Sequence, residues 1–264
     1  MIQLIAADLD GTLLGSQKRL SPDLFPLIRT LAQRGIRFAA ASGRQYHNLR
    51  ALFCEIADQM LFIAENGAAV YDGDNCLFAD QIPSSYFVGP IEAVRRLDGV
   101  NVILCTADGA FIEVTDDPVF MQNAQMYYKK LSVVPDLLAL LEHQPAFKLA
   151  VFEPGHAETG CFPVLQAYRD QFAVVLSGAD WVDLMRPQTN KGAALHRLAD
   201  YLHIPASQTM AFGDYLNDYE LLSEAGCAYA MDNGHPDLKR IADHIAPSND
   251  ENGVVRAIRA HLQL

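Results

Sequence analysis

Residues 2–12, IQLIAADLDGT, decide how the rest of the sequence is interpreted. The largely apolar run over 2–7 predicts a short buried strand, which ends abruptly in DLDGT at residues 8–12. Residues two apart on a strand point to the same face, so the carboxylates of Asp8 and Asp10 would repel each other unless a cation offset their charge. Mg²⁺ is the expected cation, because it prefers oxygen ligands and commonly accompanies phosphate, and an aspartate beside it can act as a nucleophile. The stretch therefore predicts phosphoryl transfer.

Strands and helices alternate after this first strand. Serine, proline and aspartate at residues 21–23 predict the start of a helix that ends near Gly35. Further strands are expected over 36–41, 60–64 and 68–71, with a helix over 46–57 and a tight turn over 65–67. Such alternation with nearly continuous apolar strands favours a parallel sheet covered on both faces.

The regular alternation of strands and helices is interrupted between residues 82 and 186, where prolines occur at 83, 90 and 118. Half-exposed strands are expected there over 100–106, 110–114 and 147–152. The alternation then resumes, with helices expected over 191–202 and 215–225, strands over 209–212 and 227–231, and two final helices around a short strand near 244–246. The expected fold class is α/β: a Rossmann-like doubly wound parallel-sheet core of residues 1–81 and 187–264, with an inserted α/β cap domain of residues 82–186.

Charge and cysteine content narrow the range of partners. The formal net charge of -12 disfavours nucleic acid polymers and anionic membranes, because an acidic protein repels polyanions. Five cysteines without a C-x-x-C pair are expected to be small core residues rather than a disulfide or zinc framework, and no histidine spacing indicates a metal cluster. With neither a positively charged leader nor an apolar segment of membrane-spanning length, we expect a soluble, cytoplasmic protein, monomeric or weakly homo-oligomeric.

A further acidic loop, GDYLND at residues 213–218, comes after the strand predicted over 209–212 and should lie at the same sheet edge as Asp8. In order, DLDGT, SGR at 42–44, NKG at 190–192 and GDYLND resemble the four motifs of the haloacid dehalogenase superfamily, most closely the Cof-type phosphatases of subclass IIB. The resemblance covers nearly the whole chain. Tyr215 departs from the family pattern, as does DNG at 232–234, but neither departure removes a needed functional group.

The resemblance implies a Mg²⁺-dependent phosphatase. Asp8 would attack phosphorus to form an aspartyl-phosphate and would also bind the metal. Asp10 would protonate the leaving group, later deprotonate the attacking water, and offer its backbone carbonyl to the metal. Asp214 would complete the protein's metal ligands, and Asp218 would ligate through water or orient its neighbours. The residues implied to hold the phosphoryl oxygens are Leu9, Ser42, Gly43, Lys191 and Asn217.

Some of these residues have simpler explanations. Ser42 could cap the following helix, and Lys191 taken alone would be a surface lysine. Asn217 and Asp218 could be ordinary first-turn residues of their helix. Arg44 could contact substrate or form a structural ion pair.

The size of the insertion favours a small phosphorylated substrate, such as a sugar phosphate, a nucleotide or a phosphorylated cofactor. A cap of about a hundred residues would obstruct folded proteins, exclude bulk water on closure and contact the leaving group, so selectivity is expected within residues 82–186. Two alternatives remain open: a phosphotransferase or phosphomutase that uses the same nucleophile, and a non-enzymatic regulator that responds to phosphate.

Overall fold

The computed structural model describes residues 1–141, 145–177 and 179–264, which form two compact units. One unit contains Met1–Phe78 and Asn190–Leu264, and the other contains Ala79–Thr189. The division thus falls after Phe78 and after Thr189, a few residues from the boundaries expected at 81/82 and 186/187. At the second junction, Asn190 belongs to the first unit because its side chain caps the helix that begins at Lys191, accepting a hydrogen bond from the amide of Ala193 at 2.7 Å.

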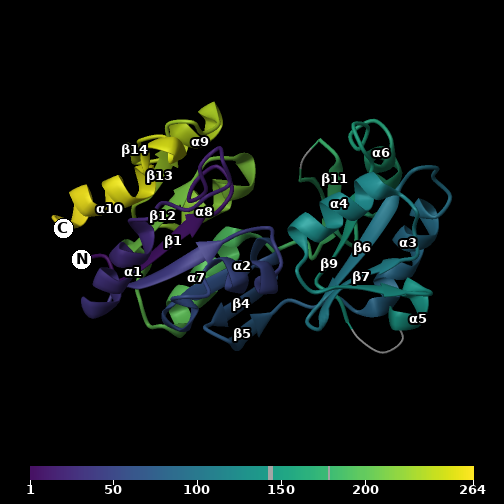
Figure 1. The fold of residues 1–264 in the computed structure, drawn as a ribbon, viewed down its shortest axis with the longest axis horizontal. Coiled ribbons are helices and arrows are strands. Elements are labelled where there is room, and N and C mark those ends of the chain that lie inside the picture. The colour runs from purple at the N-terminus through teal and green to yellow at the C-terminus, as the bar shows by residue number, and fades with distance from the viewer. Residues whose placement is uncertain (142–144, 178) are drawn as a thin grey trace. The chain divides into compact units, whose positions relative to one another are not determined.

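The first unit is built on an eight-stranded sheet in the order β14-β13-β12-β1-β2-β3-β4-β5 (Figure 1). From β14 to β3 every neighbouring pair is parallel, and β4 then pairs antiparallel with β3. This order confirms the predicted α/β class with a doubly wound core. The strands are β1 (Leu4–Asp8), β2 (Arg37–Ala41), β3 (Leu61–Ala64), β4 (Ala69–Asp72), β5 (Asn75–Ala79), β12 (Thr209–Gly213), β13 (Ala228–Met231) and β14 (His244–Ala246).

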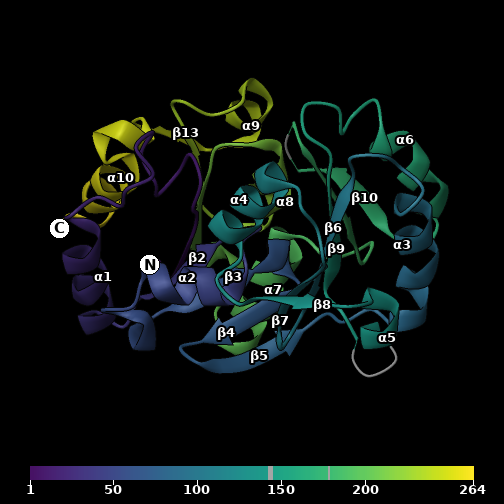
Figure 2. The same cartoon turned by 45° about the vertical axis from the view of Figure 1, so that its right-hand side comes forward.

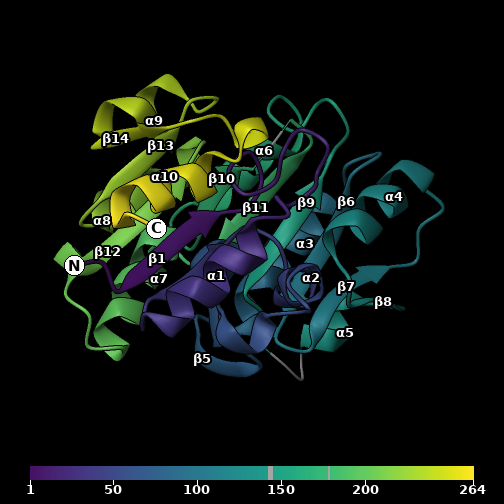
Figure 3. The same cartoon turned by 60° about the vertical axis from the view of Figure 1, so that its left-hand side comes forward.

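Helices cover both faces of this sheet, which is why all five residues of β1 are buried. In Figure 3, α1 and α10 lie on the near side of β1, and α7 and α8 lie behind it. The near face carries α1 (Leu24–Gln33), α2 (Tyr46–Leu52) and α10 (Gly253–Leu262). The far face carries α7 (Lys191–Tyr201), α8 (Tyr219–Glu224) and α9 (Pro236–Ile241), whose leucines share one core with the alternate residues of β1 and β2.

The second unit contains a six-stranded sheet in the order β10-β11-β9-β6-β7-β8, in which only β7 and β8 are parallel neighbours. Figure 2 shows α3, α5 and α6 on one side of this sheet and α4 on the other. The strands are β6 (Asn101–Thr106), β7 (Gly109–Glu113), β8 (Leu131–Val134), β9 (Lys148–Phe152), β10 (Ala173–Leu176) and β11 (Trp181–Met185). The helices are α3 (Val88–Val94), α4 (Pro118–Tyr127), α5 (Leu137–Leu141) and α6 (Cys161–Leu165).

Several local predictions need correction. The strands of the insertion were expected to be half-exposed, but β9 is wholly buried because helices pack on both of its faces. The helix predicted over 46–57 ends at Leu52, and the one predicted over 215–225 is divided into a 3₁₀ turn, Leu216–Asp218, and α8. Cys54 and Cys76 are exposed rather than core residues. Among the described residues, none of the helices has the length and hydropathy needed to span a membrane.

The remaining 3₁₀ turns are short connectors within each unit. They comprise Ala57–Gln59, Glu65–Gly67, Ser84–Phe87, Gln166–Tyr168, Ala206–Gln208 and Asn249–Glu251.

Candidate active site

Three carboxylates meet beyond the carboxyl ends of two neighbouring strands. Asp8 is the last residue of β1, and Asp214 comes directly after β12, which pairs in parallel with β1. Carboxylate oxygens of Asp8, Asp214 and Asp218 all lie within 4.8 Å of one another. The sequence predicted that these acids lie at one edge of the sheet, because parallel strands end on the same side, and the parallel register of β1 and β12 brings them together there.

Lys191 bridges two of these acids. Its Nζ donates hydrogen bonds to Oδ1 of Asp8 at 2.5 Å and to Oδ1 of Asp218 at 2.6 Å. The side chain is completely buried, so the lysine is not a surface residue. Burial alone would lower the pKa of Lys191, but the charges of Asp218 and Asp8 raise it above its ordinary value. The lysine therefore stays cationic inside the site.

The negative charge of the three acids is only partly neutralised by Lys191. Burial and the charge of Asp218 raise the pKa of Asp8 well above its ordinary value, although Lys191 opposes the shift. Burial and Asp218 likewise raise the pKa of Asp214 to about 6. One ammonium group does not neutralise three crowded carboxylates. An all-oxygen donor set with excess negative charge fits a hard divalent cation such as Mg²⁺.

Asp218 organises the loop that carries Asp214. Its Oδ2 accepts hydrogen bonds from the backbone amides of Asp214 at 3.1 Å and Tyr215 at 3.3 Å, while its Oδ1 accepts from Lys191. The carboxylate is fully buried, so all of these contacts are shielded from water. The geometry thus supports the orienting role expected for Asp218. Asn217, in the same 3₁₀ turn, is exposed.

Two residues that the sequence did not single out support Asp214. Thr12 Oγ1 donates a hydrogen bond to Oδ1 of Asp214 at 3.1 Å. Gly11 has φ +87°, and a Cβ at this position would lie 2.2 Å from Oδ2 of Asp214. Asn233 Nδ2 donates to the carbonyl of Gly11 at 2.8 Å and so ties this loop to the segment after β13. Gly11 and Thr12 belong to the DLDGT motif, so the sequence contained the means to select them, but it did not show that both contact Asp214.

Asp10 is separate from the acid cluster. Oδ2 of Asp10 accepts a hydrogen bond from Arg44 Nε at 2.8 Å, and Oδ1 accepts from Arg44 Nη2 at 2.7 Å and from Lys18 Nζ at 3.0 Å. Burial would raise the pKa of Asp10, but Arg44 and Lys18 together lower it below its ordinary value. The expectation that Asp8 and Asp10 share one face rested on the two-residue period of a strand, but β1 ends at Asp8, so that period does not extend to Asp10. For Arg44, the structure shows the ion pair.

Ser42 and Gly43 come directly after β2, the other parallel neighbour of β1, in which Ala41 is opposite Asp8. Ser42 is buried, and its Oγ accepts a hydrogen bond from the amide of Arg44 at 3.1 Å. It does not cap α2, which begins at Tyr46 after Gln45. A Cβ on Gly43 would lie 3.0 Å from the side-chain oxygen of Asn66, so this turn has little room for a side chain.

Leu9 is also fully buried, directly after Asp8. Its carbonyl accepts a hydrogen bond from the amide of Leu14 at 2.8 Å, which folds the acidic loop back on itself.

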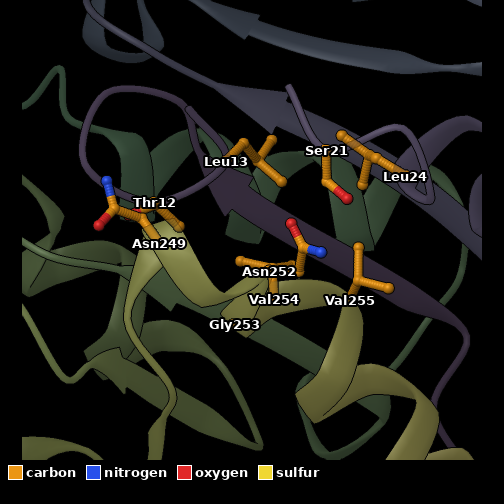
Figure 4. Close-up of a pocket in the computed structure, with 9 residues that line it drawn as sticks. All are labelled: Thr12, Leu13, Ser21, Leu24, Asn249, Asn252, Gly253, Val254 and Val255. Carbon is orange, nitrogen blue, oxygen red and sulfur yellow. The ribbon is translucent and has the colours of Figure 1, made fainter. Parts of the chain in front are cut away.

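A small pocket lies beside the acidic loop but is distinct from the acid cluster. Figure 4 shows its lining side chains, which come from the segment between β1 and the start of α1 and from the segment that includes the first turn of α10. None of the carboxylates of the cluster lines it. Its residues are Thr12, Leu13, Ser21, Leu24, Asn249, Asn252, Gly253, Val254 and Val255.

A parallel sheet whose carboxyl edge gathers acids around one buried lysine is a framework for phosphoryl transfer. A family model described as haloacid dehalogenase-like hydrolase matches residues 5–258, and the chain belongs to that family. This finding confirms the resemblance to Cof-type members of the superfamily that the four motifs indicated.

The relatives are phosphatases. The chain is 31% identical over 263 residues to the Escherichia coli 5-amino-6-(5-phospho-D-ribitylamino)uracil phosphatase YbjI, covering 97% of this chain and 95% of the relative. It is 29% identical over 250 residues to the HMP-PP phosphatase of Cronobacter sakazakii, with 93% and 89% coverage. Its structure is similar to that of SMU.1108c from Streptococcus mutans, with a TM-score of 0.89, 26% identity and 100% coverage of both chains. The chain is therefore a phosphoric monoester hydrolase rather than a non-enzymatic regulator.

Proposed function

We propose that the chain is a Mg²⁺-dependent phosphatase that hydrolyses a small phosphorylated metabolite through an aspartyl-phosphate on Asp8. The observation that carries the proposal is the buried contact of Lys191 with Asp8, beside the carboxylate of Asp214. It supplies a nucleophile, a fixed positive charge for the phosphoryl group and the remaining acids for a metal, all at one point of an otherwise acidic protein.

In the first half of the proposed reaction, a carboxylate oxygen of Asp8 forms a bond to phosphorus as the bond to the leaving oxygen breaks. Asp10 gives a proton to the departing alkoxide. In the second half, Asp10 removes a proton from water, which attacks the aspartyl-phosphate, releases inorganic phosphate and restores Asp8. Mg²⁺, held by Asp8, Asp214 and the backbone carbonyl of Asp10, would neutralise charge on the phosphoryl group. The proposed phosphoryl-binding groups are Leu9, Ser42, the amide of Gly43, Lys191 and Asn217.

The two duties of Asp10 place different demands on its surroundings. Arg44 and Lys18 favour the ionised carboxylate, which is the form needed to accept a proton from water. To donate a proton to the leaving group, Asp10 must be protonated and must give up at least part of its contact with these cations. The contact with Arg44 is therefore proposed to be weakened in the first half of the reaction and to favour the second half.

The unit formed by Ala79–Thr189 is proposed to act as the cap that contacts the leaving group and sets selectivity. Two relatives are named for small organic phosphates, 5-amino-6-(5-phospho-D-ribitylamino)uracil and HMP-PP. We extend that chemical class to this chain: a phosphorylated sugar, nucleotide or cofactor precursor. Comparable turnover of a folded phosphoprotein and of small phosphate esters would count against a cap with this role.

The test is a screen of phosphorylated metabolites for release of inorganic phosphate, with and without Mg²⁺ after treatment with EDTA, and with Asp8→Asn as the blank. We expect turnover only with the divalent ion, none in Asp8→Asn, and loss of most turnover in Asp10→Asn with less effect on metal binding. Full activity of Asp8→Asn would refute the assignment. Transfer of the phosphoryl group to an added sugar hydroxyl, without stoichiometric phosphate release, would instead support a phosphotransferase or phosphomutase.

A further inference from the structure

We propose that Cys227, His244 and His261 form a second metal site, which binds a divalent transition-metal ion, with Zn²⁺ as the expected occupant. Sγ of Cys227 and a ring nitrogen of each histidine all lie within 4.8 Å of one another. Thiolate and imidazole are the ligands that Zn²⁺ prefers, whereas Mg²⁺ takes oxygen ligands. The sulfur and nitrogen cluster therefore has a different metal preference from the carboxylate cluster around Asp8.

The three ligands come from the amino ends of two neighbouring strands of the sheet and from a helix that covers one of its faces. Cys227 directly precedes β13, His244 is the first residue of β14, and His261 lies in the last turn of α10. Tyr229 is opposite His244 in the parallel register, so these two side chains point to the same face of the sheet. The distances between the ligand atoms show that Cys227, just before β13, and His261, on α10, both reach His244. The ligands are far apart in the sequence, so no short zinc-binding motif reveals them.

Tyr229 holds one of the ligands in place. Its hydroxyl lies 3.0 Å from Nδ1 of His261. In the tautomer in which Nδ1–H donates to this hydroxyl, Nε2 has the free lone pair and can bind a cation. Such an outer contact fixes the ring and increases its basicity, as is usual for metal-binding histidines. The Tyr229 ring is itself stacked on Phe212, with the ring centroids 4.9 Å apart, which limits the orientations open to it.

The cluster is accessible to an ion without unfolding. Cys227 is 8% exposed, and both histidines are exposed. Three protein ligands leave a fourth tetrahedral position for water, and the thiol releases its proton when the metal binds. Asp243, whose Oδ2 accepts a hydrogen bond from the amide of Ala228 at 2.9 Å, adds a negative charge next to this region.

The position of the cluster separates it from phosphoryl transfer. Cys227 and His244 stand at the amino ends of β13 and β14, while Asp8 and Asp214 stand at the carboxyl ends of β1 and β12 in the same parallel sheet. Four strand residues span about 13 Å, so one cluster lies at the amino ends of the parallel strands and the other at their carboxyl ends. The proposed ion would therefore join the last turn of α10 to the edge strand β14 rather than act on substrate.

The experiment uses the full chain, freed of metal with EDTA and then kept in excess Mg²⁺ so that the carboxylate cluster is occupied. Co²⁺ replaces Zn²⁺ as a spectroscopic probe, because a thiolate ligand gives cobalt a charge-transfer absorption in the near ultraviolet. We expect this absorption to saturate at one equivalent of Co²⁺ and to disappear when Zn²⁺ is added. It should be absent in Cys227→Ala. His244→Ala and His261→Ala should each bind about tenfold or more weakly.

Matched controls are Cys54→Ala and His156→Ala, which change an exposed cysteine and an exposed histidine outside the cluster. Both should retain the cobalt absorption of the native protein. His261→Ala alters an exposed side chain, so it should keep its circular dichroism spectrum and its phosphatase turnover with Mg²⁺ while losing the increase in Tm that Zn²⁺ gives the native protein. Absence of a thiolate–cobalt absorption in the native protein, or its survival in Cys227→Ala, would overturn the proposal.

Discussion

The guanidinium of Arg44 holds the carboxylate of Asp10 through two parallel hydrogen bonds, from Nε to Oδ2 at 2.8 Å and from Nη2 to Oδ1 at 2.7 Å. The arginine side chain is 15% exposed, so water screens the pair only partly. A planar fork of this kind fixes the direction of the carboxylate as well as its charge. The residue proposed to move protons is thus positioned by a side chain outside the acid cluster.

Arg44→Lys should lower kcat by about tenfold to a hundredfold, because a charged hydrogen bond contributes about 1.5–3 kcal/mol and lysine cannot form the two-pronged contact. The effect should fall on kcat more than on KM if Arg44 acts by orienting Asp10. Steady-state kinetics on one substrate measures both quantities. Arg50→Lys is the control, since Arg50 pairs with the exposed acids Asp58 and Asp74. Native kcat in Arg44→Lys would contradict the positioning role.

Lys191→Met should destabilise the protein by about 3–5 kcal/mol, because it leaves the buried carboxylates of Asp8 and Asp218 without their cation. Unfolding in urea without divalent ions measures this loss. Mg²⁺ should restore part of the stability by neutralising the same acids, but turnover should remain absent.

Arg29→Met provides the comparison for Lys191→Met. It breaks an exposed pair with Glu55 at 3.8 Å and should change the free energy of unfolding by no more than about 1 kcal/mol. Equal losses in the two variants would show that the buried lysine has no special role in stability.

Gly11→Ala should abolish most activity and weaken Mg²⁺ binding. The added Cβ would lie 2.2 Å from Oδ2 of Asp214, and φ is +87°. Gly35→Ala separates the two effects, since Gly35 also has positive φ, +74°, but nothing lies within 4 Å of its Cβ. Both variants should lose about 1–2 kcal/mol of stability from the left-handed backbone. Only Gly11→Ala should lose activity. Thermal unfolding measures the loss of stability in both variants, and phosphate release measures the loss of activity.

Asp214→Asn and Asp218→Asn should differ in severity. Asp214 is a proposed metal ligand, so its substitution should remove measurable Mg²⁺ binding in calorimetry. Asp218 acts through the amides of Asp214 and Tyr215 and through Lys191, so its substitution should weaken Mg²⁺ binding by about ten- to a hundredfold. Stronger loss in Asp218→Asn than in Asp214→Asn would reverse the proposed roles of the two acids.

The α/β class and the acid–lysine edge could be predicted from local patterns. Apolar runs of strand length, each with a polar loop after it, placed Asp8, Ser42 and Asp214 at one sheet edge because parallel strands end on the same side. The order of the motifs then identified Lys191, although its burial could not be foreseen from one lysine in a loop. Strands β5, β8, β10 and β11 were not predicted, because segments of four or five residues carry little periodic signal of their own.

The sequence alone determined the helices and strands that have a clear hydrophobic period, because that period is a property of neighbouring residues. It also determined the order of the four motifs along the chain. Only the tertiary structure decided which distant side chains meet. Asp10 turns to Arg44, 34 positions away, because β1 ends before it. Lys191 reaches Asp8 across 183 positions. Cys227, His244 and His261 converge only after β13, β14 and α10 pack together. Such contacts depend on strand register and helix packing, which no short window of sequence contains.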